Sequence, residues 1–213
     1  MTKIISFISR KGGIGKTTSA INLATMMYSL GHKLTVVETD TNYTLSTLRS
    51  MELYQTNAKD ASIFKILGST PASIMADLDT LKQQSLDFIL VDSAGKTTDE
   101  EIKRLAVASH AIIVPTSLTQ NDTLVTYQTI QDLKPALELN TDLKILVLPN
   151  RIHTSTRPAT IQNALKELDA HILGQKVPQK NAFANYSTIL PEKGYLPVTK
   201  EIISLLGGAP NNE

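Results

Sequence analysis

The sequence predicts an α/β fold in which one mainly parallel, twisted sheet carries helices on both faces. Short apolar, β-branched runs alternate with segments of helical spacing along the chain. A glycine-rich loop joins the first such run to the first helical segment. The 213 residues suffice to bury a sheet between two helix layers, so a single domain spanning 1–213 is expected.

The glycine-rich loop follows the strand predicted at 3–8 and opens a helix that should end near Gly31. Strand, glycine-rich turn and helix form the context that a phosphate-binding loop requires. Backbone N–H groups of glycines and a helix N-terminus both attract anions. Lys16 would reach the β- and γ-phosphates of a nucleotide, and the Thr17 hydroxyl would ligate Mg²⁺. The residues expected to bind ATP or ADP are Lys11, Gly12, Gly13, Ile14, Gly15, Lys16, Thr17 and Thr18.

Two further apolar runs lead into aspartates. The run at 33–38 is followed by Asp40, and the run at 86–91 ends at Asp92, which continues as Ser93-Ala94-Gly95. Right-handed crossovers between parallel strands bring such strand ends to one edge of the sheet, beside the phosphate loop. An aspartate after a buried strand is the Walker B pattern, so Asp92 is predicted to hold the Mg²⁺ water shell.

The rest of the chain continues the alternation. The sequence Thr98-Asp99-Glu100-Glu101 is a capping box that should open a helix, and Pro135 should kink or end the helix that contains it. The other predicted elements are a helical connection at 44–67, helices at 69–84, 122–139, 155–170, 181–190 and 198–206, and strands at 110–115, 143–149 and 172–177.

The loop reads K-G-G-x-G-K-T-T, with Arg10 where the usual G-x-x-x-x-G-K-[ST] pattern has glycine and with an additional lysine at Lys11. This form resembles the deviant Walker A loop of the ParA/MinD family of dimerising ATPases. The resemblance covers essentially the whole chain, with its specific motifs at 10–18, 38–42 and 86–95. It implies a P-loop NTPase fold, ATP hydrolysis, and a signature lysine, Lys11, that reaches the nucleotide of the partner in a homodimer.

The resemblance also assigns residues outside the loop. The family's second strand ends in D-x-D-P-Q, whose second aspartate positions the attacking water. Asp40 falls at that place, beside Mg²⁺, whereas Glu38, Thr41 and Asn42 depart from the pattern. In the family, an Asn or Arg after the strand at 143–149 lies near the adenine, and the backbone beside a later proline contacts the base. These positions are Asn150, Arg151 and Pro178, although a turn asparagine and a solvated arginine explain the first two equally well.

Within the family the chain looks like a short, plasmid-partition type of ParA. The resemblance implies an ATP-dependent homodimer that binds non-specific DNA and is reset by a ParB-like or centromere-binding adaptor protein. The net charge of +1 requires a local basic patch for such binding. The candidate DNA contacts are Arg151, Arg157, Lys176, Lys180, Lys193 and Lys200.

Three other functions share parts of this pattern. A MinD-like membrane switch would carry a basic amphipathic C-terminal helix, but residues 201–213 contain no lysine or arginine, so no stable membrane association is expected. A metabolic ATP-dependent ligase would not need Lys11. A ParA-like ATPase that positions another cargo, in conjugation, at a microcompartment or at a cell pole, shares every motif and remains open.

The amino-acid composition and the position of the phosphate loop exclude several kinds of site and segment. The sequence has no cysteine, which excludes disulfides, cysteine-ligated zinc and iron–sulfur clusters. The phosphate loop follows only nine residues, so no N-terminal DNA-binding extension and no signal peptide are expected. The predicted location is cytoplasmic, with nucleoid association in the ATP-bound state.

Overall fold

The computed structural model describes residues 1–57, 63–94 and 98–207. In this part of the chain a parallel sheet has the strand order β3-β2-β4-β1-β5-β6-β7, which confirms the predicted fold class. Its strands are β1 (Lys3–Phe7), β2 (Leu34–Glu38), β3 (Lys65–Gly68), β4 (Phe88–Asp92), β5 (Ala111–Thr116), β6 (Lys144–Pro149) and β7 (His171–Ile172).

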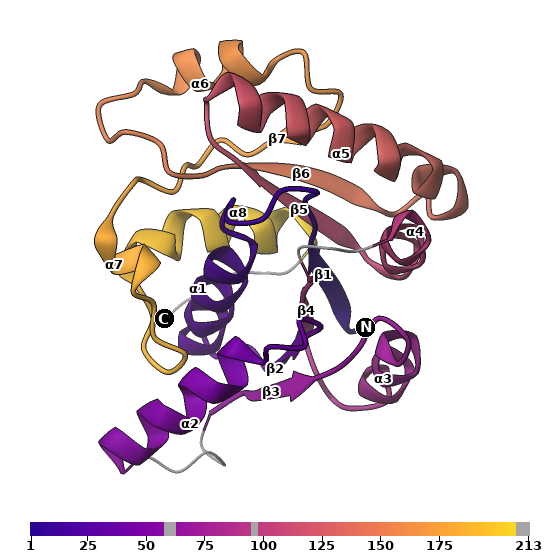
Figure 1. Ribbon diagram of the computed structural model, residues 1–213, viewed down its shortest axis with the longest axis vertical. Helices are drawn as coiled ribbons and strands as arrows, with labels where there is room; N and C mark the ends of the chain where they lie inside the picture. The colour runs from indigo at the N-terminus through magenta and orange to yellow at the C-terminus, as the bar shows by residue number, and fades with distance from the viewer. Residues whose placement is uncertain (58–62, 95–97, 208–213) are drawn as a thin grey trace.

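Helices cover both faces of the sheet. In Figure 1 α1 and α2 lie to the left of the strands, and α3 and α4 lie to the right. The helices are α1 (Lys16–Ser29), α2 (Thr44–Thr56), α3 (Ile74–Lys82), α4 (Asp99–Ala108), α5 (Gln120–Leu139), α6 (Pro158–Leu165), α7 (Asn181–Ala184), the 3₁₀ turn η2 (Lys193–Tyr195) and α8 (Leu196–Leu205).

The strands separate two apolar cores because successive side chains point to opposite faces. On β1, Ile5 and Phe7 face the core that contains α1, α2, α7 and α8. Ile4 and Ile8 face the second core, which contains α3, α4, α5 and α6. All four side chains are at most 1% exposed, which explains why apolar residues of this segment lie on both faces of the sheet instead of alternating with exposed polar ones.

The strand order brings the three predicted motifs together. Strand β4 lies between β1 and β2, with Asp92 opposite Phe7 on one side and opposite Glu38 on the other. The segments that follow these strands therefore leave the sheet at the same edge. The expected convergence of the phosphate loop, the Asp40 loop and Asp92 is present in the structure.

One predicted element was wrong. The helical connection expected at 44–67 instead ends at Thr56, and Lys65–Gly68 form the edge strand β3, paired with β2. The helix expected at 122–139 is present as Gln120–Leu139, and Pro135 does not end it. Leu133 and Ala136 are at most 1% exposed on either side of the proline, so tertiary packing offsets the lost hydrogen bond.

The other predicted helices and strands differ from the structure mainly at their ends. Thr98 and Glu101 form the predicted capping box at the start of α4. The strand expected at 172–177 shrinks to the two residues of β7, followed by a bridge between Ile152 and Pro178. The remaining helices are shorter than expected at 69–84, 155–170 and 181–190, and α8 begins at Leu196 rather than 198.

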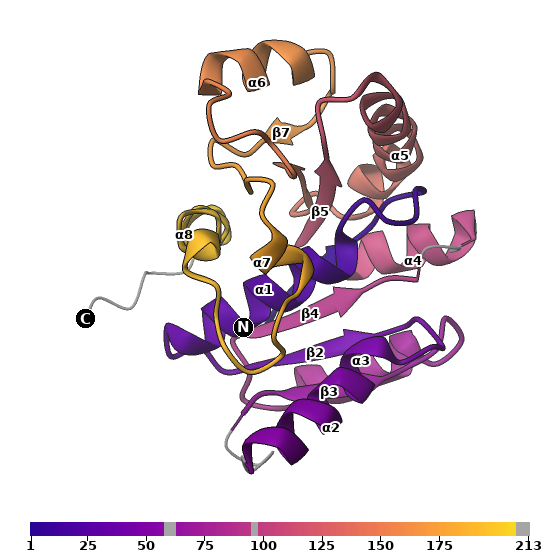
Figure 2. The same cartoon turned by 60° about the vertical axis from the view of Figure 1, so that its left-hand side comes forward.

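The segment after α7, which loops down toward α2 in Figure 2, is fastened to that helix. Arg49 on α2 is 4% exposed and donates to Thr188 Oγ1 at 3.0 Å and to the Thr188 carbonyl at 2.7 Å. Its third hydrogen bond reaches the Phe64 carbonyl at 2.9 Å, and Glu52 accepts from the Thr188 N–H at 2.8 Å. A buried guanidinium is stable because these acceptors satisfy it.

The helices of the described residues are all too short or too polar to cross a membrane.

Candidate nucleotide-binding site

The phosphate loop needs glycine at two positions. Gly13 and Gly15 have φ angles of 72° and 103°, in the left-handed region that strains other residues. A Cβ on Gly15 would also lie 2.4 Å from Asn150 Nδ2. Gly15 is the N-cap of α1, so the helix N-terminus and its unpaired N–H groups face the loop.

Asn150 fastens this loop from the end of β6. Its side chain is 3% exposed and donates from Nδ2 to the Ile14 carbonyl at 2.9 Å. Asn150 is therefore a structural support of the phosphate loop.

Lys16 points into the site of its own chain. It is 7% exposed, and its Nζ lies 3.4 Å from the Lys11 carbonyl. Burial lowers the pKa of Lys16, while the charges of Asp92 and Asp40 oppose that effect. Lys16, Asp40 and Asp92 thus interact electrostatically, as one site requires.

Asp92 is 2% exposed, and burial raises its pKa to about 7. Thr17 and Lys16 lower this pKa, whereas Glu38 and Asp40 raise it further. Among the described residues, Asp92 Oδ1 is a buried oxygen that lacks a hydrogen-bond partner. An orphaned carboxylate oxygen near the Thr17 hydroxyl fits Mg²⁺, which binds one or two protein ligands together with waters and phosphates.

In the described residues, protein side chains alone do not form a complete metal-binding site. The residues at 1–57, 63–94 and 98–207 contain no group of three or more His, Asp or Glu side chains placed to hold a metal. Thr17 and Asp92 could therefore hold Mg²⁺ only together with nucleotide phosphates and water.

The loop after β2 is organised by carboxylates. Asp40 is half-buried, and its Oδ1 accepts from the Asn42 N–H at 3.0 Å, which forms an Asx turn. Glu38, at 1% exposure, accepts from the Leu45 N–H at 2.7 Å and the Ser46 N–H at 3.2 Å. It thereby caps α2, whose own N-cap residue makes no side-chain hydrogen bond. The departure from the family pattern at Glu38 has this structural use.

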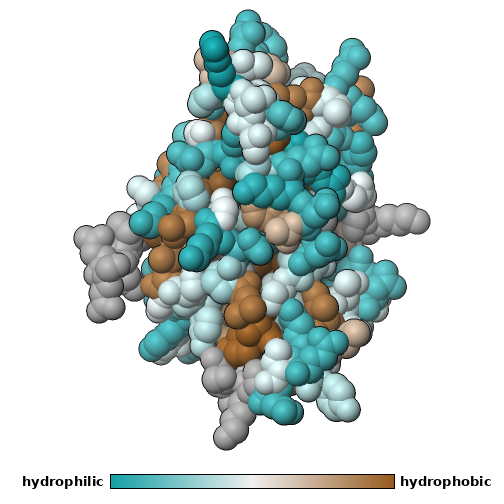
Figure 3. Space-filling view, turned by 90° about the vertical axis from the view of Figure 1, so that its left-hand side faces the viewer, coloured by the Kyte–Doolittle hydropathy of each residue, from teal (hydrophilic) through white to brown (hydrophobic). Residues whose placement is uncertain are grey.

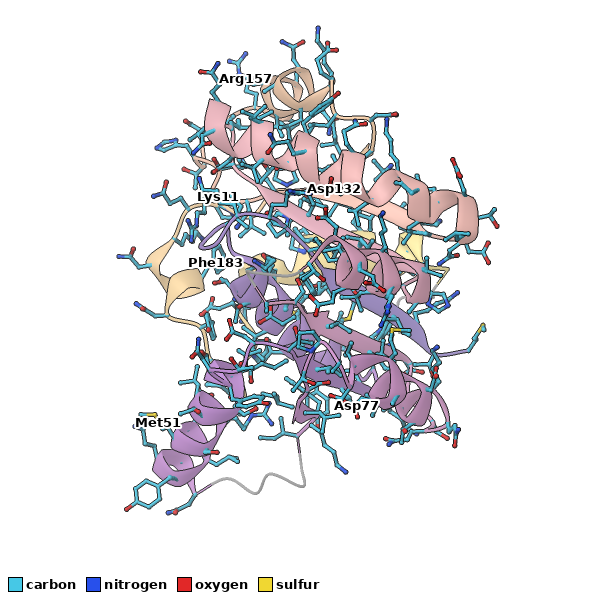
Figure 4. All side chains as sticks on the ribbon, turned by 45° about the vertical axis from the view of Figure 1, so that its right-hand side comes forward. Lys11, Met51, Asp77, Asp132, Arg157 and Phe183 are labelled. Atoms are coloured by element: carbon cyan, nitrogen blue, oxygen red, sulfur yellow. The ribbon has the colours of Figure 1, made fainter. Side chains whose placement is uncertain are left out.

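A pocket of about 250 Å³ lies beside the phosphate loop, between it and α7. It brings together the three residues predicted near the base, although they come from separate segments of the chain. Arg151 adopts φ 56°, and Phe183 supplies an aromatic wall to the same pocket (Figure 4). The pocket is lined by Gly15, Thr18, Asn150, Arg151, Pro178, Gln179, Lys180, Asn181 and Phe183.

Lys11 points away from the site of its own chain. Its Nζ lies 2.5 Å from Oδ1 of Asp122, at the start of α5, and its side chain is 36% exposed (Figure 4). Burial of Asp122 raises its pKa, but hydrogen bonds from Lys11 and Ser117 outweigh burial and lower the pKa overall. Asp122 was not predicted from the sequence to belong to the site. The pattern Thr119-x-x-Asp122 could have indicated a helix start, which the structure contains, but nothing local indicates the pairing with Lys11.

Arg10, the residue that replaces the usual glycine, fastens the beginning of the loop. Its guanidinium bonds to Asp132 on α5 and, at 3.0 Å, to Asp99 on α4. These two carboxylates were also not predicted to belong to the site.

The candidate DNA contacts have different surroundings. Lys176 donates to the carbonyls of His153, Thr154 and Thr156 at 3.2, 2.9 and 2.6 Å, so it organises that loop. Arg151 and Lys180 line the pocket beside the phosphate loop. The exposed candidates are Arg151, Arg157, Lys180, Lys193 and Lys200.

Comparison with known proteins agrees with this geometry. The family model described as VirC1 protein matches residues 2–207. Protein virC1 of Rhizobium rhizogenes is 27% identical over 92% of this chain and 84% of its own length. The chromosome-partitioning ATPase Soj of Treponema pallidum (strain Nichols) is 37% identical, but over 33% of this chain and 30% of its own.

The solved structures support the fold. A plasmid partition protein from Borrelia burgdorferi B31, bound to AMPPNP, superposes with a TM-score of 0.68 at 18% sequence identity. The match covers 96% of this chain and 98% of that one. Since the family model spans nearly all of the chain, the protein belongs to the VirC1 family of ParA/MinD-type ATPases.

Proposed function

We propose that the protein is an ATP-dependent dimerising switch of the DNA-partition type. The observation that carries this proposal is the contrast between Lys16, buried in its own site, and Lys11, held at the rim by Asp122. A lysine of the phosphate loop that does not serve its own nucleotide is placed to serve the nucleotide of a second copy. Binding of ATP would then be coupled to dimerisation, and hydrolysis to release.

In this proposal Lys16 and the amides of the loop bind the β- and γ-phosphates, and the partner's Lys11 adds a positive charge to the γ-phosphate. Thr17 and Asp92 would hold Mg²⁺, which would neutralise further phosphate charge. Asp40 orients the attacking water, and its electrostatic interaction with Lys16 supports that role. The pocket lined by Asn150, Arg151 and Pro178 accepts the adenine.

The ATP dimer would bind non-specific DNA through exposed basic side chains and would be released by a ParB-like adaptor. The local similarity to a chromosome-partitioning ATPase and the fold shared with a plasmid partition protein support this reading. In Figure 3 the face that includes α1, α2 and α7 is mainly hydrophilic, with its brown patches separated by polar side chains. Such a surface suits contact with DNA phosphates better than insertion into lipid.

The test is binding of the purified protein to random-sequence duplex DNA with ATP and Mg²⁺, with ADP, and without nucleotide, each at two salt concentrations. We expect binding only with ATP, and an affinity that falls steeply with salt because phosphate contacts release counterions. Binding that is equal in all nucleotide states, or insensitive to salt, would contradict the proposal.

A second candidate is a ParA-like ATPase that positions a cargo other than a plasmid. It is favoured by one observation: the relative named for chromosome partitioning matches a third of the chain, whereas the VirC1 family matches nearly all of it. An ATP-dependent dimer that binds no DNA in the assay above would support this candidate, and liposome binding would then be measured.

A further inference from the structure

Thr39 stands between β2 and the Asp40 loop and is 6% exposed. Its backbone N–H donates to the Asp92 carbonyl at 3.1 Å. Its hydroxyl donates to the same carbonyl at 3.3 Å and accepts from the Ala94 N–H at 3.0 Å. One side chain thus joins the Asp40 loop to the segment that follows Asp92.

These bonds continue the pairing of β2 with β4 by one residue, with a hydroxyl in place of a backbone carbonyl. Glu38 lies opposite Asp92, so Thr39 lies opposite Ser93. In a parallel ladder the backbone carbonyl of Thr39 would accept from the Ala94 N–H, because each residue bonds to both neighbours of the residue opposite. The Thr39 hydroxyl accepts that bond instead. The backbone of Thr39 can therefore turn away from the sheet toward Asp40 while the two segments remain joined.

The segment after Asp92 is also fixed on its other side. The Ser93 hydroxyl is buried and donates to the Phe7 carbonyl, at the end of β1, at 2.6 Å. Hydroxyl groups therefore connect this segment to both neighbouring strands, just before the phosphate loop on one side and just before Asp40 on the other. A shift of the segment relative to either loop would change the separation of Asp40, Asp92 and Lys16.

We propose that Thr39 is a positioning residue for ATP hydrolysis, whose hydroxyl holds the Asp40 loop at a fixed distance from Asp92. This inference rests on the proposed role of Asp40 as the residue that orients water. The hydroxyl acts on turnover rather than on nucleotide affinity, since the phosphate loop and the base pocket do not depend on it. A displacement of about 1 Å in a reacting group costs up to about 100-fold in rate.

The experiment compares Thr39→Val, which keeps the shape and removes the hydroxyl, with Thr39→Ser, which keeps the hydroxyl. Release of radiolabelled phosphate gives kcat and KM for ATP, titration gives the ADP affinity, and thermal unfolding gives Tm. We expect Thr39→Val to lower kcat about tenfold, because the backbone bond to Asp92 remains, with KM and ADP affinity within about twofold. Thr39→Ser should stay within about twofold of the native kcat.

The matched control is Thr199→Val, which removes another buried hydroxyl, one that donates to the Tyr195 carbonyl within the C-terminal helical region. It should leave kcat unchanged. Native turnover in Thr39→Val would overturn the proposal. So would a joint loss of ADP affinity and Tm in Thr39→Val, or equal impairment of Thr39→Ser, because each indicates a merely structural role.

Asp40→Ala separates this inference from the proposal on which it rests. If Asp40→Ala hydrolyses ATP at the native rate, the role of Asp40 fails and the explanation given for Thr39 fails with it. If Asp40→Ala is impaired and Thr39→Val is not, only the role of Thr39 fails.

Discussion

Lys11 and Lys16 belong to the same loop, yet their surroundings differ in nearly every respect. Lys16 is buried, its pKa is lowered by burial, and it acts on Asp92 and Asp40 at the carboxyl edge of the sheet. Lys11 is partly exposed and bonded to Asp122 on a helix that follows the fifth strand. One glycine-rich turn thus directs two cations to two different sites, with Gly13 and Gly15 in left-handed conformations between them.

The largest expected effect is at Lys16. Lys16→Ala should weaken ADP binding about 100-fold or more, since the bonds from a buried ammonium to phosphate oxygens are charge-assisted. Isothermal titration calorimetry measures this loss. Lys11→Ala is the matched control and should bind ADP within about twofold of the native protein. ADP binding of native strength in Lys16→Ala would remove the difference between the two lysines.

Lys11→Ala should abolish the ATP-dependent dimer, because the γ-phosphate in each site would lose the charge supplied by the other copy. Light scattering in ATP and in ADP measures the molar mass in each state. Arg10→Ala, which removes a neighbouring cation that is also paired within the chain, should still dimerise. An ATP dimer in Lys11→Ala would disprove the assignment of the signature lysine.

The raised pKa of Asp92, which interacts with Lys16, can be tested through the pH dependence of stability. Burial raises the pKa of Asp92 to about 7, so the folded protein retains this proton at pH values where the unfolded chain has lost it. The free energy of unfolding should therefore fall as pH rises from about 4 to about 7, by up to about 1.4 kcal/mol per pH unit from this group. Urea unfolding without nucleotide or Mg²⁺ measures it, with the non-titrating Asp92→Asn as reference. Parallel pH profiles for the two proteins would contradict the raised pKa.

The smallest effect is expected at Asp122, which competes with the partner's nucleotide for Lys11. A partly exposed ion pair contributes about 1 kcal/mol, so Asp122→Asn should tighten the ATP dimer about fivefold. Analytical ultracentrifugation measures the dissociation constant, and Asp132→Asn, which affects Arg10 instead, is the control. A weaker dimer in Asp122→Asn would indicate that Asp122 contacts the partner.

The fold was predictable where burial alone decides structure. Strands β1, β4 and β6 are rich in apolar residues on both faces because both faces are covered, and that pattern is visible in the sequence. Strand β3 was missed because it is an edge strand of four residues, three of them exposed, which lacks an apolar run. Pro135 does not end α5 because the packing of its neighbours, which outweighs its local preference, depends on a distant part of the chain.

Some residues of the site were also predictable from the sequence, and others were not. The phosphate loop and the position of Asp92 beside it were predictable from motifs that require particular chemistry at fixed spacing. Asp122 and Thr39 were not, because their partners are 111 and 55 residues away and depend on strand order and register. Both are common residue types at ordinary positions, a helix start and a strand end. Their identification requires the structure.

The bonds from Arg49 to Thr188 matter for the growing chain on the ribosome. Thr188 is made 139 residues after Arg49, which takes roughly 7 to 28 seconds at ordinary rates of synthesis. During that time the Arg49 guanidinium lacks the two oxygen acceptors that Thr188 provides. We expect ribosome-bound chains halted before residue 188 to lose α2 to protease faster than full-length chains released from the ribosome; equal rates would exclude this order of events. The phosphate-binding motifs are synthesised first, whereas the segment that completes the hydrogen bonds of α2 is synthesised near the end of the chain.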